Sequence, residues 1–264
     1  MRTSSLRFSR ASLLGVVSLM FVGAAHAGPP FITDDPEPVE LHHWEVYLAT
    51  QPFHNADGWS GTLPHLEVNY GLAPDLQVHV IAPMAFNKTA GQSTQYGYGD
   101  TELGFKYRFI QETDSFPMVG IFPLVELPSG DADRGLGNGK AQAFFPLWVQ
   151  KTFGKWSTYG GGGYWYHPGT DNRDYWFMGW QVQRKITDEF ALGMEVFHET
   201  AKTRGGGSDT VAQLGAIYDF SENYHLLASI GHTVQGQGAL LGYLAFQITF
   251  GPEEPKKMEK VSGK

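Results

Sequence analysis

The stretch TELGFKYRF, residues 101–109, alternates apolar and polar side chains without a break. In an extended strand Leu103 and Phe105 fall on one face, and Lys106 and Arg108 fall on the other. This period of two predicts a β-strand with one apolar face. The segment alone fits a soluble sandwich as well as a membrane barrel, because strands of both kinds can bury one face and leave the other polar.

The same alternation recurs along the chain in about twelve runs, and the boundaries are expected to hold within about two to four residues. The runs are residues 44–53, 62–72, 75–86, 98–110, 117–128, 140–153, 156–167, 174–186, 190–201, 209–220, 224–235 and 240–250. Tight connections such as 73–75 alternate with longer loops rich in Gly, Asp, Asn and Thr, such as 54–61 and 129–139. Outer-membrane barrels sort short periplasmic turns from longer external loops in this way. The chain is therefore predicted to be all-β, a single antiparallel transmembrane β-barrel with both ends in the periplasm.

The two ends of the chain differ from the barrel in composition. Residues 1–27 contain three arginines, then an apolar stretch, then Ala25-His26-Ala27, which predicts a cleaved secretory signal peptide; a buried helix or a membrane anchor is the alternative. Residues 28–43 are expected to be an extended acidic, proline-rich segment, either periplasmic or facing the lumen. Residues 44–250 would form the barrel, and residues 251–264 a polar tail.

Charge and cysteine content exclude several classes of function. The formal net charge of −8 becomes −11 when the three arginines of the signal peptide are removed. An acidic chain without a basic stripe is a poor nucleic-acid binder, so no nucleic-acid partner is expected. The absence of cysteine rules out disulfides, thiolate catalysis and Cys-ligated metals.

Aromatic residues and glycines add to the barrel interpretation. One group of aromatic residues lies near predicted strand ends or on runs with an apolar face, where interfacial girdles would use them; ordinary sheet packing is the alternative. The group is Trp44, Trp148, Trp156, Tyr159, Trp165, Trp176 and Trp180. Glycines at residues 160–163 would let the wall bend or take an inward plug.

The polar faces of the predicted strands supply the candidate functional residues. The lumen-lining candidates are Glu45, His65, Glu67, His79, Glu102, Lys106, Arg108 and Glu195. They are tolerable if they line water or pair across a lumen, and they would form either a polar constriction or a salt-bridged filling without transport. In the N-terminal segment, Asp34, Asp35 and Glu37 are expected to lie near basic groups or a cation, and a solvated leader is the alternative.

Metal and catalytic motifs are not evident. Asp131 and Asp133 have the spacing of a calcium loop, but no Glu completes a twelve-residue frame, so no metal site and no cofactor are expected. The histidines are scattered, and neither Gly-x-Ser-x-Gly nor His-Glu-x-x-His occurs. The protein is expected not to be an enzyme, with an outer-membrane lipase as the remaining enzymatic alternative.

Four stretches carry a resemblance to a known family. GPPFITDDPEPVELHHWEVYLA (28–49), GDTELGFKYRF (99–109), LVELPSGDADRGLGNGK (124–140) and PLWVQKTFGKWSTYGGGGYWY (146–166) occur in the expected order. Together they resemble the transporter family named after the meta-pathway of phenol degradation (MetA-pathway). The resemblance implies an outer-membrane barrel related in kind to channels for hydrophobic or aromatic compounds, and it implies no catalytic residue.

The sequence thus predicts a Gram-negative outer-membrane barrel that acts as a passive channel for small, hydrophobic or aromatic compounds. Its expected partners are outer-membrane lipid and a small-molecule solute, and the sequence does not decide the oligomeric state. A plugged structural or ligand-binding barrel without transport is the alternative, followed by a soluble periplasmic β-protein.

Overall fold

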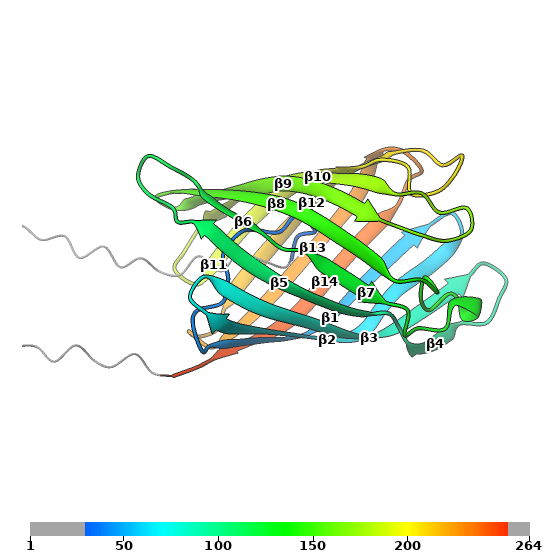
Figure 1. Cartoon of the computed structure of the whole chain (residues 1–264), viewed down its shortest axis with the longest axis horizontal. Helices are drawn as coiled ribbons and strands as arrows, with labels where there is room; N and C mark the ends of the chain where they lie inside the picture. The colour runs from blue at the N-terminus through cyan, green and yellow to red at the C-terminus, as the bar shows by residue number, and fades with distance from the viewer. Residues whose placement is uncertain (1–29, 253–264) are drawn as a thin grey trace, which may run out of the picture.

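The alternating runs form the wall of a closed antiparallel barrel in the computed structural model, which describes residues 30–252 (Figure 1). Neighbours in sequence are neighbours in the sheet, and the first strand pairs with the last, with Trp44 opposite Phe250. The predicted signal peptide and most of the polar tail lie outside the described residues.

Within residues 30–252, fourteen strand segments make up the wall. They are β1 (Trp44–Asn55), β2 (Gly58–Ala73), β3 (Leu76–Thr89), β4 (Gln95–Tyr98), β5 (Thr101–Ile110), β6 (Met118–Ile121), β7 (Leu124–Leu127), β8 (Gln142–Phe153), β9 (Trp156–Tyr166), β10 (Tyr175–Lys185), β11 (Phe190–Glu199), β12 (Asp209–Asp219), β13 (Tyr224–Gln235) and β14 (Leu240–Phe250). A short 3-10 turn, η1 (Ala132–Arg134), lies in the loop before β8.

Two of the predicted strands are interrupted, which explains why fourteen segments make twelve strands of the barrel. β4 and β5 are separated at Gly99 and Asp100, where the Asp100 carboxylate accepts hydrogen bonds from the backbone of Gly130 and Asn138 in the facing loop. β6 and β7 are separated at Phe122 and Pro123, since proline has no N–H to donate to the ladder. The predicted all-β barrel of twelve strands is confirmed.

One predicted loop is wrong. Residues 54–61 were expected to form a long external loop, but β1 and β2 continue to a turn at Ala56 and Asp57. The polar, glycine-rich sequence there is compatible with strand pairing because Gly58 and Gly61 adopt φ of 139° and 138°, which their lack of a side chain permits.

The surface of the barrel is inside out compared with a soluble protein. Phe105 is 43% exposed on the exterior, whereas the next residue, Lys106, is 3% exposed on the interior. Large apolar side chains such as Leu48, Leu192 and Leu214 continue the exterior surface. No helix within residues 30–252 is long and apolar enough to cross a membrane.

The predicted aromatic girdle is only partly correct. Trp44, Trp156, Trp176 and Trp180 are exposed on the outer surface, as a lipid-facing position requires. Three other members of the predicted group face the interior, where Trp148 is 1% exposed: Trp148, Tyr159 and Trp165. These three aromatic rings lie on the same face of the sheet as lumenal glutamines such as Gln150. The alternation along the strand, and not the residue type, therefore decides whether an aromatic side chain points to the lumen or to the exterior.

Candidate functional site

The lumen of the barrel is filled by a plug, which we define as residues 30–40. Seven of the eleven plug residues are buried, and its Pro30 and Pro36 are among the most deeply buried residues of the described chain. In Figure 1 the plug is the blue segment that runs within the barrel before β1. The chain then meets the wall at Leu41, which forms an isolated bridge with Gly71.

The plug is attached to two opposite walls by side chains. On β11, Glu195 is 1% exposed and accepts hydrogen bonds from the backbone N–H groups of Ile32 and Thr33. On β3, Gln77 Oε1 accepts the N–H of Val39 at 2.9 Å. These contacts satisfy plug backbone groups that would otherwise be buried without partners.

Charged groups make a second set of plug contacts. Lys106 Nζ donates to Asp34 Oδ1 at 2.9 Å and lies 3.4 Å from Asp35 Oδ2. Arg108 Nη1 lies 3.9 Å from Glu37 Oε1, and Arg108 Nη2 lies 2.7 Å from Asp75 Oδ1. All three acidic candidates of the N-terminal segment therefore lie next to wall cations.

Three of the lumen-lining candidates form a hydrogen-bonded network on β2, β3 and β5. Asn69 donates from Nδ2 to Glu67 Oε1, and its Oδ1 accepts from His79 Nδ1 at 2.6 Å. His79 Nε2 lies 2.8 Å from Glu102 Oε1. The network is continuous from Glu67 to Glu102, and it lies beside Phe122, whose ring meets His79 edge-on at 5.1 Å.

The structure places all eight lumen-lining candidates on the inner face, but it does not join them in one cluster. Glu45 accepts a hydrogen bond from Tyr47 on the same strand at 2.8 Å. His65 Nδ1 lies 2.6 Å from Thr62 Oγ1. Glu195 lies on the wall opposite Lys106, with the plug between them.

Sequence reasoning missed a largely aromatic cluster that extends from the interruption between β6 and β7 to β12. Its buried members are Phe122, Phe144, Trp148, Phe177, Phe197 and Val211, and plug residue Ile32 packs against it. Phe144 stacks on Trp165 with ring centroids 4.8 Å apart. The signal was present in the alternation of β8, where Phe144 and Trp148 share a face with Gln142 and Gln150.

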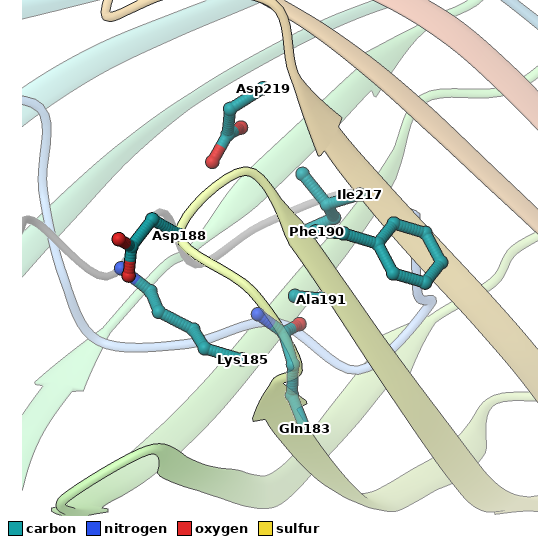
Figure 2. Close-up of a pocket in the computed structure, with 7 residues that line it drawn as sticks. All are labelled: Gln183, Lys185, Asp188, Phe190, Ala191, Ile217 and Asp219. Atoms are coloured by element: carbon teal, nitrogen blue, oxygen red, sulfur yellow. The ribbon is translucent and has the colours of Figure 1, made fainter.

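A small pocket opens beside the turn between β10 and β11 (Figure 2). It is lined by Gln183, Lys185, Asp188, Phe190, Ala191, Ile217 and Asp219. Since β1 begins and β14 ends at this same end of the barrel, the pocket lies at the end where the tight turns gather.

Metal ligands are not assembled within residues 30–252, where no group of three or more His, Asp or Glu side chains could hold an ion. Asp131, half of the calcium-like pair, instead caps η1 by accepting the N–H of Arg134 at 3.3 Å.

A sequence profile of the family described as "Putative MetA-pathway of phenol degradation" matches residues 62–249. The chain belongs to this family. The resemblance inferred from the four sequence stretches is thereby confirmed. No curated protein matches the chain by sequence.

Solved structures share the fold at low sequence identity. An outer-membrane channel from Pseudomonas putida F1 superposes with a TM-score of 0.67 at 14% identity, over 82% of this chain and 98% of that one. The NanC porin gives a TM-score of 0.56 at 7% identity, over 77% and 98% of the two chains. The KdgM porin gives 0.52 at 10% identity, over 77% and 99%. This family member therefore has the fold of outer-membrane barrels.

Proposed function

We propose that this protein is an outer-membrane channel for small, hydrophobic or aromatic compounds, and that its own plug closes it. The observation that carries the proposal is the mode of plug attachment. Residues 30–40 are held by side-chain contacts such as Lys106–Asp34 and Glu195–Ile32, and they add no strand to the sheet. The plug can leave while every strand pair of the wall remains intact.

A tether at the base of the plug supports this movement. His42 donates its N–H to the carbonyl oxygen of Gly71 at 2.8 Å, and Gly71 donates to that of His43 at 3.0 Å. His42 has φ of 63°, a left-handed conformation at the point where the chain turns from the plug into β1. Residues 41–43 are therefore the pivot about which the plug would swing.

The apolar exterior and the family support the location. A belt of outward leucines and phenylalanines is costly in water and favourable in lipid, so the outer membrane is the environment that this wall fits. The relatives of known structure are an outer-membrane channel and porins, which also favours a non-enzymatic role.

The aromatic cluster supports the solute class. Once the plug has left, the rings of Phe144, Trp148 and Phe177 would line the half of the lumen farther from the tight turns. Aromatic faces provide large contact areas for apolar and aromatic solutes.

A filled lumen also supports one alternative, a structural barrel without flux. Planar bilayers separate the two functions when wild-type protein is compared with a variant that lacks residues 30–40. A channel closed by its plug gives rare openings in the wild type and steady conductance in the deletion variant. The contrary result is a deletion variant that shows the heat-dependent gel mobility of a folded barrel and yet conducts no current. That result would favour the structural barrel.

A further inference from the structure

Phe31 of the plug occupies a site on the inner wall that exists because two glycines there have no side chains. A methyl group added to Gly193 would lie 2.8 Å from Cζ of Phe31, and one added to Gly215 would lie 2.7 Å from the same atom. Gly193 and Gly215 are directly paired across β11 and β12. The phenyl ring therefore lies against a glycine floor, which we call the ring seat, and Phe31 is only 8% exposed there.

One edge of the ring seat is polar. The row next to the glycines consists of Gln181, Glu195 and Gln213, which pair across three strands. Gln181 is 0% exposed, and its Oε1 has no hydrogen-bond partner among residues 30–252. Its amide nitrogen lies 2.9 Å from where a methyl group on Gly193 would stand, which places this amide beside the Phe31 ring. A buried acceptor without a donor is costly, so the seat offers a hydrogen bond that the phenyl ring cannot use.

The opposite edge of the ring seat is apolar and lies towards the tight-turn end of the barrel. The next row towards the tight turns is Ala191, Ile217 and Leu227, again paired across neighbouring strands. Ala191 and Ile217 also line the pocket drawn in Figure 2. A molecule in the ring seat would thus adjoin a pocket that opens at the tight-turn end of the barrel.

We propose that the ring seat is a binding site for a small, neutral, monocyclic aromatic compound that carries a hydrogen-bond donor. In the closed barrel the Phe31 side chain occupies this site in place of the compound. The solute ring takes the place of the phenyl group on Gly193 and Gly215. Its donor bonds to Gln181 Oε1 or to Glu195, which loses the Ile32 and Thr33 donors when the plug leaves. An aromatic carboxylate is rejected, because its charge would face that of Glu195 in a buried site.

Binding of the solute and seating of the plug then exclude each other. A ligand that binds only the open state raises the ratio of open to closed protein by a factor of one plus its concentration over its dissociation constant. The inference rests on the proposed function in one respect, since it treats the plug as movable. It requires no flux.

The chain contains no cysteine, so one introduced cysteine reports on the plug. Ile32→Cys places a thiol between the plug and the aromatic cluster, and its rate of reaction with a maleimide measures how often the plug is out. Phenol, toluene and benzoate are the probes, applied to purified protein in detergent. Phenol at ten times its dissociation constant is expected to raise the rate about tenfold, with saturation, while benzoate leaves it unchanged.

Glycine variants provide the matched test. In Gly215→Ala the methyl group both expels Phe31 and fills the seat, so labelling is expected to be fast without phenol and to show no response to it. Gly193→Ala is the second variant, in case the first does not form a heat-modifiable barrel. Gly207→Ala is the control, because a methyl group there meets no atom of the described residues within 4 Å.

Three results would overturn the inference. A phenol response that survives in Gly215→Ala would place binding elsewhere, and an equal response to toluene would remove the role of the hydrogen bond. The third result is that phenol changes neither the labelling rate of the Ile32→Cys protein with both seat glycines intact nor the melting temperature of a Phe31→Ala protein, whose seat is vacant. In that case the ring seat binds no such solute. Channel activity is read separately in bilayers, so a failure here leaves the proposed function standing, and a silent barrel there leaves the ring seat standing.

Discussion

Lys106 on β5 donates from Nζ to Asp34 Oδ1 of the plug across 2.9 Å, inside a site where the lysine is 3% exposed. The pair joins residues 72 positions apart in the sequence and connects the wall to the segment that fills the lumen. The same ammonium group lies 5.1 Å from the centre of the Phe122 ring, at the interruption between β6 and β7.

Lys106→Ala is expected to loosen the plug without unfolding the barrel. Removal of one partner of a buried ion pair costs about 3–5 kcal/mol, and this cost falls on the closed state because Asp34 and Asp35 can return to water when the plug leaves. The open probability in planar bilayers should rise at least about tenfold. Lys151→Ala, at a pair that lies outside the plug contacts, is the control. Unchanged gating in Lys106→Ala would show that the pair does not hold the plug.

Glu195→Gln tests the opposite wall. The amide keeps the shape of the carboxylate but has only one acceptor oxygen, so it accepts a neutral hydrogen bond from one of the Ile32 and Thr33 N–H groups and loses the other, a loss of about 1 kcal/mol. Maleimide labelling of a cysteine at position 32 should become roughly fivefold faster. Glu222→Gln in an exposed turn should leave the rate unchanged, and equal rates in both variants would exclude Glu195 as a plug contact.

Phe105→Arg tests the direction of the faces. An arginine on the lipid face near the midplane destabilises a barrel by about 2–4 kcal/mol, measured by reversible unfolding in lipid vesicles. Phe116→Arg, in the turn between β5 and β6, should cost about 0–1 kcal/mol because the side chain reaches the interface. Equal costs at the two positions would contradict the placement of the membrane.

The corrected aromatic positions can be tested by fluorescence. Trp176 is 53% exposed on the exterior, whereas Trp148 lies in the lumen at 1%. Brominated lipids should quench the wild-type emission, and Trp176→Phe should remove part of the quenchable signal. Trp148→Phe should leave that part in place, and loss of quenching in this variant would return Trp148 to the lipid face.

The loop between β9 and β10 should respond to acid. The backbone N–H of His167 and the hydroxyl of Tyr164 donate to Asp174 and hold the pKa of its carboxyl below the usual value. A depressed pKa in the folded state means that the stabilisation is complete above the ordinary value near 3.8 and is lost as the pH falls through the folded value. The protection of residues 167–173 against hydrogen exchange, relative to the intrinsic rate at each pH, should therefore fall below about pH 4, and Asp174→Asn should show low protection at neutral pH.

The alternation of apolar and polar residues was sufficient to predict the strands of the wall, but it was insufficient to predict which side chains fill the lumen. The alternation of residues 101–109 predicts the outward Phe105 and the inward Lys106, because strand direction depends only on neighbouring residues. Trp148 was misplaced because an aromatic ring suits lipid and lumen alike, so residue type could not decide. Pro123 indicates a break in the strand, but the alternation continues on both sides of it, so the sequence predicts one continuous strand.

The ring seat could not be predicted in the same way. Gly193 and Gly215 come from different strands, and their meaning depends on Phe31, which is more than 160 residues away from either in the chain. At residues 160–163, Gly161 allows the close approach of the neighbouring strand, because an added Cβ would overlap the Leu147 carbonyl oxygen and lie 3.0 Å from the Trp148 ring.

A reversible cross-link tests the central claim, that the plug closes this barrel, most directly. The side chain of Thr33 lies against Gly179 on β10, where an added Cβ would stand 3.1 Å from that of Thr33, within 1 Å of the roughly 3.8 Å found in disulfides. Cysteines at these two positions are the only ones in the chain. The oxidised protein should be silent in planar bilayers and should begin to conduct when a reductant is added to the same membrane. Equal conductance before and after reduction would contradict a plug-gated channel.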